Sequence, residues 1–498
     1  MAFSNTPQNS TYRTVQVKFD DTSTLRSADN TVRRDSHIIN FYYDRISQEN
    51  QQREVCLVKR PGLSATTATL NKSVTTDSIR GYFYDEQDDI YFWAVGNKVY
   101  AYISGTATLN TLLTLSTTTG VVCFQSFRTS TGQSYVVFSD GAGLAYYQLR
   151  VGATTATAVT DPDLPTPHNP RFAVLDGYVF ISSGNTIYNS DVDTIGVWTV
   201  GNDIDAEMSG DVIVALIQNK NYVVALGLNS LEIFWDAANA SGSPLKRNDS
   251  GFKSIGYLTG YAQSDDKHFF VGQDRNANVC VYMMENFKVD RISNAVVERT
   301  IQSINTTGFS AGRVLPDSNG VILSVDGHTF YCFTTTDITW VYDVEEKMWY
   351  EWRSAAGGTF RPEAAWAKFG GGQYIANYGS NTIDILSSLV YNDKGVNFTC
   401  SYTTQDSLFG SVNWKTCNRV SLVADRHLPS GTSNAVLQWS DNDWADGVTG
   451  QQNVNLFSNL PRTFRAGRFR NRSFRVLYTD NYPVRMKYLE LEINIGSH

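Results

Sequence analysis

Seven short hairpin patterns at nearly constant intervals constrain this 498-residue chain more than any other feature. Each is an apolar run, a turn rich in Gly, Asn or Asp, and a second apolar run, as is typical of a β-hairpin. The seven patterns begin at Ile90, Tyr135, Tyr178, Tyr222, Phe269, Phe330 and Tyr374. The successive separations are 45, 43, 44, 47, 61 and 44 residues. A hairpin every 40–50 residues indicates the four-stranded blades of a β-propeller, whereas a generic β-sandwich gives no reason for so steady a period.

We therefore predict six or seven blades, in which the hairpins supply the middle strands. The single long interval predicts an insertion with a helix near 292–304. The apolar residues of this segment recur at helical spacing and would pack on the core: Ile292, Val296, Val297, Ile301 and Ile304.

Three units are predicted along an all-β chain. Residues 1–76 form an N-terminal docking segment and residues 77–388 form the propeller. After Leu386 the hairpin period stops, and the alternating runs of Val396–Ile495 suit a C-terminal β-sandwich-like domain, 389–498. Aromatic residues make up 13% of the chain, a composition that favours strands.

The charge balance limits the partners. A net charge of −8 and a pI near 5.4 argue against tight duplex binding, because nonspecific affinity comes from Lys and Arg. The same charge balance is compatible with a surface along which DNA slides without sticking. The polar start has no cationic leader, and no apolar run reaches 18 residues, so we expect no secretory signal and no membrane span.

The sequence lacks the common motifs of catalytic, phosphate-binding and metal-binding sites. The six histidines are scattered without an HExxH motif, and there is neither a P-loop nor a GxSxG motif. The six cysteines form no CxxC and are predicted to be buried free thiols. The acidic pairs Asp88-Asp89 and Asp265-Asp266 are predicted to lie in turns. We therefore expect no catalytic, cofactor or metal site, and a protein that is not an enzyme.

The stretch Trp439–Trp444, WSDNDW, resembles the aspartate box of sialidases, in which Asp and Trp stabilise a hairpin turn without catalysis. It lies outside the propeller period and has Asn-Asp where that motif has Gly. We interpret it as a turn.

The most unusual charged feature is a run of arginines near the C-terminus. The candidate basic stripe comprises Arg465, Arg468, Arg470 and Arg472, and on a strand the last three would share one face. Three interpretations remain open: a DNA-facing surface, an interface with an acidic neighbouring subunit, and a solvated face paired with local carboxylates such as Asp480. We favour the subunit interface, because each neutralised phosphate slows DNA release and Arg is enriched at interface hot spots.

Several motifs occur in an order that resembles the hub, or nozzle, proteins of short-tailed phages, the packaged-DNA stabilisation family. The central motifs are Asn229–Asp236 (NSLEIFWD), Ser250–Phe252, Ile255-Gly256, Phe269–Gly272 and Arg291–Ser293. Two outer stretches agree with the family: Asn40–Tyr43 followed by Lys59–Leu63, and Gln438–Asp441 with the arginine-rich run after it. The sequence departs from the N-terminal pattern at Tyr43-Asp44.

The resemblance implies a non-enzymatic virion protein of the tail, assembled in the host cytoplasm as a ring, a hexamer in the family. The ring would lie below the portal and adaptor, extend and close the channel for packaged double-stranded DNA, retain the genome and let it pass at ejection. Its other partners would be a tail needle, fibres or tailspikes.

Two other functions remain open. A propeller glycosidase or depolymerase would need an arginine cluster and a carboxylate acid at the central mouth. A glycan- or receptor-binding propeller would use exposed Trp and Tyr on loops.

Overall fold

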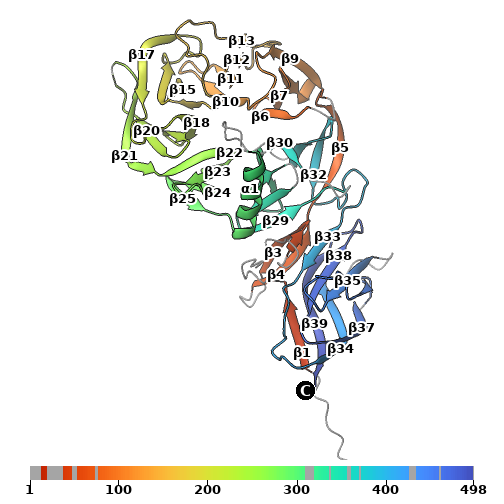
Figure 1. Cartoon of the computed structure of the whole chain (residues 1–498). Helices are drawn as coiled ribbons and strands as arrows, with labels where there is room; N and C mark the ends of the chain where they lie inside the picture. The colour runs from red at the N-terminus through yellow and green to blue at the C-terminus, as the bar shows by residue number, and fades with distance from the viewer. Residues whose placement is uncertain are drawn as a thin grey trace, which may run out of the picture.

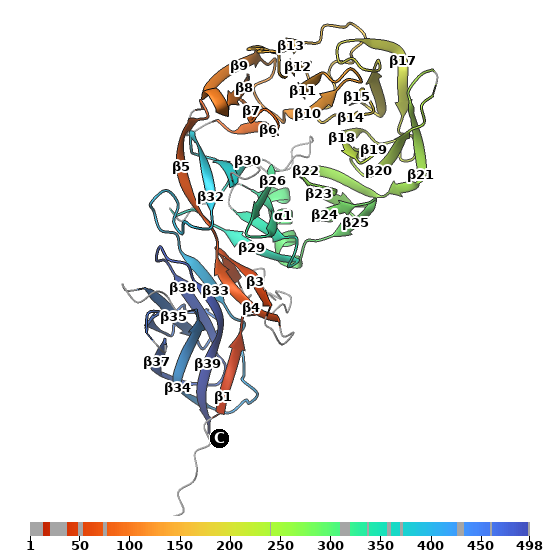
Figure 2. The ribbon, with the colours of Figure 1, turned by 180° about the vertical axis from the view of Figure 1, so that it is seen from behind.

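The structure, a computed structural model, describes residues 13–19, 37–47, 53–72, 77–239, 241–308, 319–335, 338–355, 360–368, 372–425, 433–458 and 461–496. A ring of seven β-sheets forms one end of the molecule, and a β-sandwich forms the other (Figures 1 and 2). The fold is therefore all-β with a β-propeller, as predicted, and it has seven blades.

Each blade has four strands. The innermost strands are β6 (Ile79–Asp85), β10 (Cys123–Arg128), β14 (Ala173–Leu175), β18 (Ile213–Asn219), β22 (Ile255–Ser264), β26 (Asn319–Val325) and β30 (Pro362–Lys368). The second strands are β7 (Ile90–Val95), β11 (Ser134–Ser139), β15 (Tyr178–Ser183), β19 (Tyr222–Gly227), β23 (Lys267–Asp274), β27 (His328–Thr334) and β31 (Gly372–Asn377). The third strands are β8 (Lys98–Ile103), β12 (Leu144–Gln148), β16 (Thr186–Ser190), β20 (Leu231–Asp236), β24 (Val279–Glu285), β28 (Thr339–Asp343) and β32 (Thr382–Ser387). The outer strands are β9 (Thr108–Thr114), β13 (Thr157–Ala158), β17 (Trp198–Asp205), β21 (Leu245–Lys253), β25 (Lys288–Arg291), β29 (Met348–Trp352) and β5 (Gly62–Thr69).

The seven predicted hairpins are the second and third strands of the seven blades, so this prediction is confirmed. Tyr135, Tyr178 and Tyr222 lie in three different sheets. The hairpins were visible in the sequence because blades pack face to face and bury their middle strands on both sides. Strand β7, IYFWAV, is buried throughout, whereas the outer strand β17, WTVGNDID, is mostly exposed.

The ring closes through a strand from the N-terminal segment. Strand β5 pairs antiparallel with β32, with Leu63 opposite Leu386, and completes the seventh blade. Just beyond β5, the Lys72 ammonium donates to the Glu363 carboxylate at 2.6 Å, and both side chains are fully buried. Blade seven then packs against blade one around Trp93 and Trp366. Residues far apart in sequence thus hold the ring shut.

Glycine permits the close approach of neighbouring blades at two inner-strand positions. A Cβ on Gly81 would lie 1.7 Å from the carbonyl oxygen of Val122, and a Cβ on Gly256 would lie 1.7 Å from that of Leu228. Any other residue would push the adjacent blades apart.

The predicted helix is present as α1 (Ala295–Gly308), in the interval between blades five and six. It begins three residues later than the apolar pattern did, because the Asn294 side chain accepts from the backbone N–H groups of Val296 and Val297 and caps the helix. Val296, Val297 and Ile301 are buried against blades five and six. The side chain of Ile304 lies outside the described residues.

The sandwich combines strands from both ends of the chain. They are β1 (Arg13–Lys18), β2 (His37–Ile39), β3 (Phe41–Ser47), β4 (Arg53–Lys59), β33 (Cys400–Thr403), β34 (Lys415–Ala424), β35 (Asn434–Ser440), β36 (Gly450–Asn455), β37 (Arg462–Phe469), β38 (Ser473–Tyr478) and β39 (Arg485–Ile495). One sheet has the order β3-β4-β39-β34-β37, with β1 also on β39. The other has the order β2-β33-β38-β35-β36 and continues blade six, because β2 pairs with β29. The strands of the predicted N-terminal segment therefore belong to the sandwich and to blade seven, while its role as a docking segment remains a proposal.

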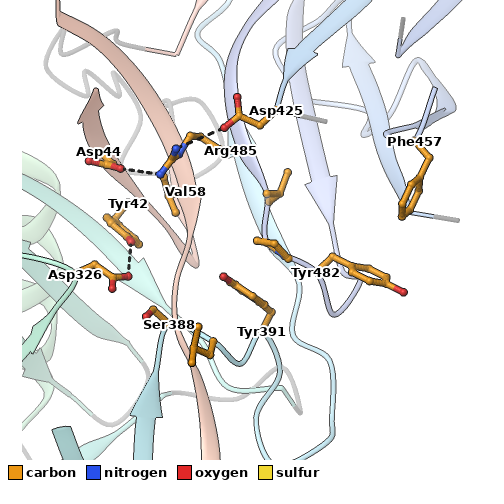
Figure 3. A pocket seen from close by; sticks show the side chains of 13 residues that line it. Tyr42, Asp44, Val58, Asp326, Ser388, Tyr391, Asp425, Phe457, Tyr482 and Arg485 are labelled. Carbon is orange, nitrogen blue, oxygen red and sulfur yellow. Dashed lines mark hydrogen bonds and ion pairs between the residues drawn. The ribbon is translucent and has the colours of Figure 1, made fainter. Parts of the chain in front are cut away.

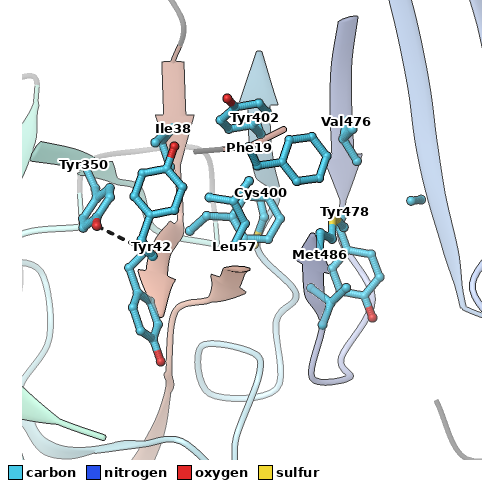
Figure 4. Close-up of a cluster of buried hydrophobic side chains, with 14 of the residues drawn as sticks. Phe19, Ile38, Tyr42, Leu57, Tyr350, Cys400, Tyr402, Val476, Tyr478 and Met486 are labelled. Carbon is cyan, nitrogen blue, oxygen red and sulfur yellow. Dashed lines mark hydrogen bonds between the residues drawn. The ribbon is translucent and has the colours of Figure 1, made fainter. Parts of the chain in front are cut away.

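One hydrophobic core joins the sandwich to blades six and seven (Figure 4). Phe19 and Tyr402 meet edge to face with their ring centroids 4.8 Å apart. At the junction Arg60 is completely buried, donates to both carboxylate oxygens of Asp393 at 2.7 and 3.1 Å, and lies over the Phe398 ring. The propeller and the sandwich therefore share one continuous core.

All six cysteines are free and buried, as predicted. Burial raises the pKa of Cys400 to about 12 and that of Cys417 to about 11. Such thiols are unreactive at neutral pH. Within the described ranges, no helix is long and apolar enough to cross a membrane.

Candidate functional site: two surfaces at opposite ends of the sandwich

The structure corrects the predicted basic stripe, because Arg472 does not share a face with the other arginines. Its side chain is 1% exposed and binds both carboxylate oxygens of Asp441, with Nε at 2.5 Å and an Nη at 2.8 Å. The guanidinium also lies 4.2 Å from the centroid of the Phe469 ring. Arg472 is therefore an internal ion-pair residue.

Two features of β37 break the predicted stripe: a bulge before Arg468, and the end of the strand before Arg472. The pairing of β34 with β37 shifts register between Cys417 and Arg419, and opposite this shift Arg465 and Gly467 have φ values of +59° and +82°. A bulge adds a residue to one strand and re-aims the side chains after it. Strand β37 then ends at Phe469, so period two does not extend to Arg472.

Arg468 and Arg470 remain exposed and converge on one indole ring. Their guanidinium carbons lie 5.0 and 5.2 Å from the centroid of the Trp414 ring, within the range of cation–π attraction. Trp414 is itself 37% exposed. We call these three residues the arginine–tryptophan cluster. Arg465 is also exposed, but it makes no such contact among the described residues.

The apolar surroundings of the cluster are also exposed. Leu408 and Val412 lie in the loop that leads to Trp414, and Val412 is 71% exposed. The carbonyl oxygen of Trp414 accepts from the N–H of Gly496, so the cluster lies at the end of the sandwich farthest from the propeller (Figure 1). A basic surface with exposed apolar groups is typical of an interaction site.

Asp480, the carboxylate offered by the sequence as a partner for these arginines, is engaged elsewhere. It accepts from the N–H of Asn434 at 2.9 Å. In the described part of the chain, neither Arg468 nor Arg470 lies within ion-pair distance of a carboxylate. The guanidinium groups are therefore available to an external partner.

A groove of about 950 Å³ lies at the opposite end of the sandwich, where it meets the propeller (Figure 3). We call it the junction groove. Its lining is Tyr42, Asp44, Val58, Asp326, Ser388, Leu389, Tyr391, Asp425, Phe457, Tyr482, Pro483, Val484 and Arg485.

Acidic groups predominate among the charges of the junction groove. Arg485 lies between Asp44 and Asp425, with nitrogen–oxygen distances of 3.3 and 3.6 Å. Asp326 accepts a long hydrogen bond from the Tyr42 hydroxyl at 3.5 Å. Burial, followed by the nearby carboxylates, raises the pKa of that hydroxyl well above its usual value. Among the described residues of the lining, three carboxylates thus face one cation, and this part of the groove attracts positive charge.

The propeller's central opening offers a different environment. It has a volume of about 450 Å³, and Glu363 is the one carboxylate among the described residues that line it. That carboxylate binds Lys72. Arg171 lies over the Tyr261 ring at 4.7 Å. Most glycosidases need two carboxylates across the scissile bond, so this opening does not favour the glycosidase alternative.

One cluster that the sequence did not indicate lies in the hairpin of blade six. His328, Asp343 and Glu345 place ligand-type atoms within 4.8 Å of one another. His328 Nδ1 lies 2.9 Å from Asp343, while Glu345 accepts from the N–H of Thr329 at 2.7 Å. Only strand pairing brings these residues together, so no spacing rule could have found them. Their mutual bonds give them a structural role in the turn.

The WSDNDW stretch forms a turn after β35, as predicted. The Ser440 hydroxyl accepts from the N–H of Trp444 at 2.8 Å, and Trp444 is buried beneath Arg475, which lies 3.9 Å from its ring centroid. The predicted acidic pairs also lie in turns, where Asp88 pairs with Arg150 and Asp266 pairs with Lys220. None of these groups forms a catalytic constellation.

A family model described as "Bacteriophage P22 Gp10, beta-propeller" (Phage_stabilise) matches residues 44–383, which is more than half of the chain. The chain belongs to this family. Membership of the Phage_stabilise family indicates a structural protein of the phage tail and a non-enzymatic role. The resemblance stated from the sequence is confirmed at the level of the family, and the match extends into strand β32 of blade seven.

Comparison with other proteins adds no argument about this chain. No curated protein matches the chain. The β-propeller domain of Cps50 (Swd1) from Myceliophteria thermophila is similar at 9% identity and a TM-score of 0.40, over 64% of this chain and all of that one. The N-terminal domain of Nup159 is similar at 12% identity and a TM-score of 0.37, over 66% of this chain and 94% of that one. Likenesses at this level carry no information on the function of a Phage_stabilise protein.

Proposed function

We propose that this protein is the hub or nozzle of a short-tailed phage tail. It forms a ring that extends and closes the DNA channel, retains the packaged genome and lets it pass at ejection. The observation that carries the proposal is the match of residues 44–383 to the Phage_stabilise family.

The physical properties of the chain support this role. The pocket among the propeller's inner strands, about 450 Å³, is the size of a small-molecule site, and we infer that the DNA duplex passes through a channel made by several copies. A net charge of −8 suits a wall that DNA passes without adhering. The interlocked N-terminal and C-terminal strands provide a rigid subunit for such a ring.

The proposed partners follow from the same assignment. The ring is a homo-oligomer, a hexamer as in the resemblance, assembled in the host cytoplasm. A portal adaptor lies above it, and a needle, fibres or tailspikes dock on it. The exposed arginines Arg465, Arg468 and Arg470 serve contacts between subunits, and Arg472 does not, because it is buried.

Electron microscopy tests the proposal. We expect a ring with axial symmetry from the purified protein, and antibody labelling at the tail of intact virions. Phage particles made without the protein should package DNA and then lose it. Labelling on the capsid or on fibre tips, or full retention of DNA without the protein, would contradict the hub assignment.

A reducing-sugar assay on host polysaccharide tests the enzyme alternative. We expect no sugar release, since Glu363 is bound to Lys72 and has no partner carboxylate among the described residues of the opening. Release that disappears in Glu363→Gln would show that the propeller is a hydrolase.

A further inference from the structure

The arginine–tryptophan cluster and the junction groove lie at the two ends of a single strand. Trp414 immediately precedes β34 and Asp425 immediately follows it. The strand has 10 residues, so the two surfaces are about 33 Å apart at ~3.3 Å per residue. The cluster of one chain therefore cannot enter the groove of that same chain.

The two surfaces are complementary in charge. The cluster presents two guanidinium groups on one indole. In its described lining, the groove presents three carboxylates, Asp44, Asp326 and Asp425, and one cation, Arg485. Asp326 and Asp425 are both exposed at its rim. Guanidinium groups bind carboxylates through paired hydrogen bonds, which are among the stronger polar contacts in proteins.

The two surfaces are also complementary in apolar area. The groove exposes Leu389 to 87% and Tyr482 to 41%, while the cluster exposes Trp414 and, beside it, Val412. Large exposed apolar groups beside charged ones are typical of contact sites. Trp and Arg together dominate interface hot spots.

We propose that the arginine–tryptophan cluster of one subunit inserts into the junction groove of a second copy of this chain. The contact joins two different surfaces and is heterologous, so its repetition closes into a ring when the rotation between subunits permits. The inference rests on the proposed ring and names the surfaces that build it.

The charges favour a second copy over nucleic acid as the occupant. Phosphates would be repelled by the groove, and two arginines on an acidic chain give little of the counterion release that drives DNA binding. A second copy supplies both halves of the contact in equal number, and each subunit in a closed ring uses both.

A charge swap tests the contact. The first variant carries Arg468→Asp and Arg470→Asp, and the second carries Asp326→Lys and Asp425→Lys. All four positions are exposed, so both variants should fold and melt within a few degrees of the wild type. Size-exclusion chromatography with light scattering then reports the assembly state.

We expect the wild type to form a ring and each variant alone to remain monomeric. An equimolar mixture of the two should assemble again, because each cluster meets a groove of opposite charge, and the mixed ring should hold an even number of subunits. A single chain with all four substitutions should also assemble. The matched control, Lys246→Asp with Arg275→Asp, makes the same charge change at exposed propeller positions and should assemble as the wild type does.

The outcomes separate this inference from the proposed function. If the variants assemble alone, or if the mixture stays monomeric, the contact is wrong while a ring built by other surfaces remains. If the first variant assembles normally but loses DNA binding in a mobility-shift assay, the cluster faces DNA and the inference is overturned. A wild type that is monomeric at every concentration overturns it too. If the swap works but antibody labelling is absent from tails, the contact stands and the hub function fails.

Discussion

Replacing Arg472 by Met should destabilise the sandwich although the arginine lies in a sequence run of exposed ones. The substitution removes the pair with Asp441, whose hydrogen bonds are 2.5 and 2.8 Å long, and the contact with the Phe469 ring. Removing one partner of a buried ion pair costs about 3–5 kcal/mol. The Asp441 side chain is 27% exposed and can regain water, so we expect a loss near the lower end, about 3 kcal/mol.

Arg468→Met is the matched control, because it deletes an exposed guanidinium from the same segment. Its contacts with Trp414 are exposed, and its cost should stay within about 1 kcal/mol. Urea unfolding followed by tryptophan fluorescence measures both variants. Asp441→Asn, alone and combined with Arg472→Met, completes a double-mutant cycle that should give a coupling of about 2 kcal/mol or more. Equal losses in the two arginine variants, or no coupling in the cycle, would refute the assignment of Arg472 as an internal ion-pair residue.

Three further predictions concern the propeller. Burial lowers the pKa of His268 to about 4, so its contribution to stability is complete above pH 6.5 and falls by about 3 kcal/mol as the pH drops from 6.5 to 4. The variant His268→Gln should lose that part of the pH dependence of the unfolding free energy, and identical pH profiles of wild type and variant would contradict the prediction. Gly256→Ala should lower the free energy of unfolding by at least about 2 kcal/mol, because the added Cβ would lie 1.7 Å from a carbonyl oxygen of the preceding blade. Gly105→Ala has open space around it and should change little, so similar thermal melting of the two variants would contradict the close-approach argument. Lys72→Met should cost about 3–5 kcal/mol by leaving the Glu363 carboxylate buried and unpaired, and adding Glu363→Gln should recover part of that loss; a neutral Lys72→Met would show that the pair does not hold the ring shut.

Local patterns were enough to predict the propeller. A middle strand buried on both faces must be apolar along its length, and a hairpin turn needs residues such as Gly96, which has a φ of +54°. Both signals lie within a few residues of each other, so each hairpin was found independently of its neighbours. The helix was predicted for the same reason, because the spacing of Val297 and Ile301 matches one helical turn and is itself a local pattern.

The closing strand and the sandwich could not be predicted in this way. Strand β5 pairs with β32 across more than 300 residues, and β2 joins blade six to the sandwich, so no local pattern shows which partner each strand takes. The sequence indicated alternating runs in the C-terminal domain but no strand at Gly62–Thr69, and the tertiary structure decided the sheet to which each strand belongs.

For the arginine run, too, the sequence determined one part of the outcome and the tertiary structure decided the rest. The residues by themselves determined a cluster of positive charge near the C-terminus of an acidic chain. Period two predicted one face, but β37 ends at Phe469, and after the bend that follows it Arg472 turns inward to Asp441 while Arg468 and Arg470 lie on Trp414. The end of a strand depends on its pairing with a neighbouring strand, and a buried ion pair needs a carboxylate brought from 31 residues away. Only the folded chain supplies both, so tertiary structure decided which arginines face outward.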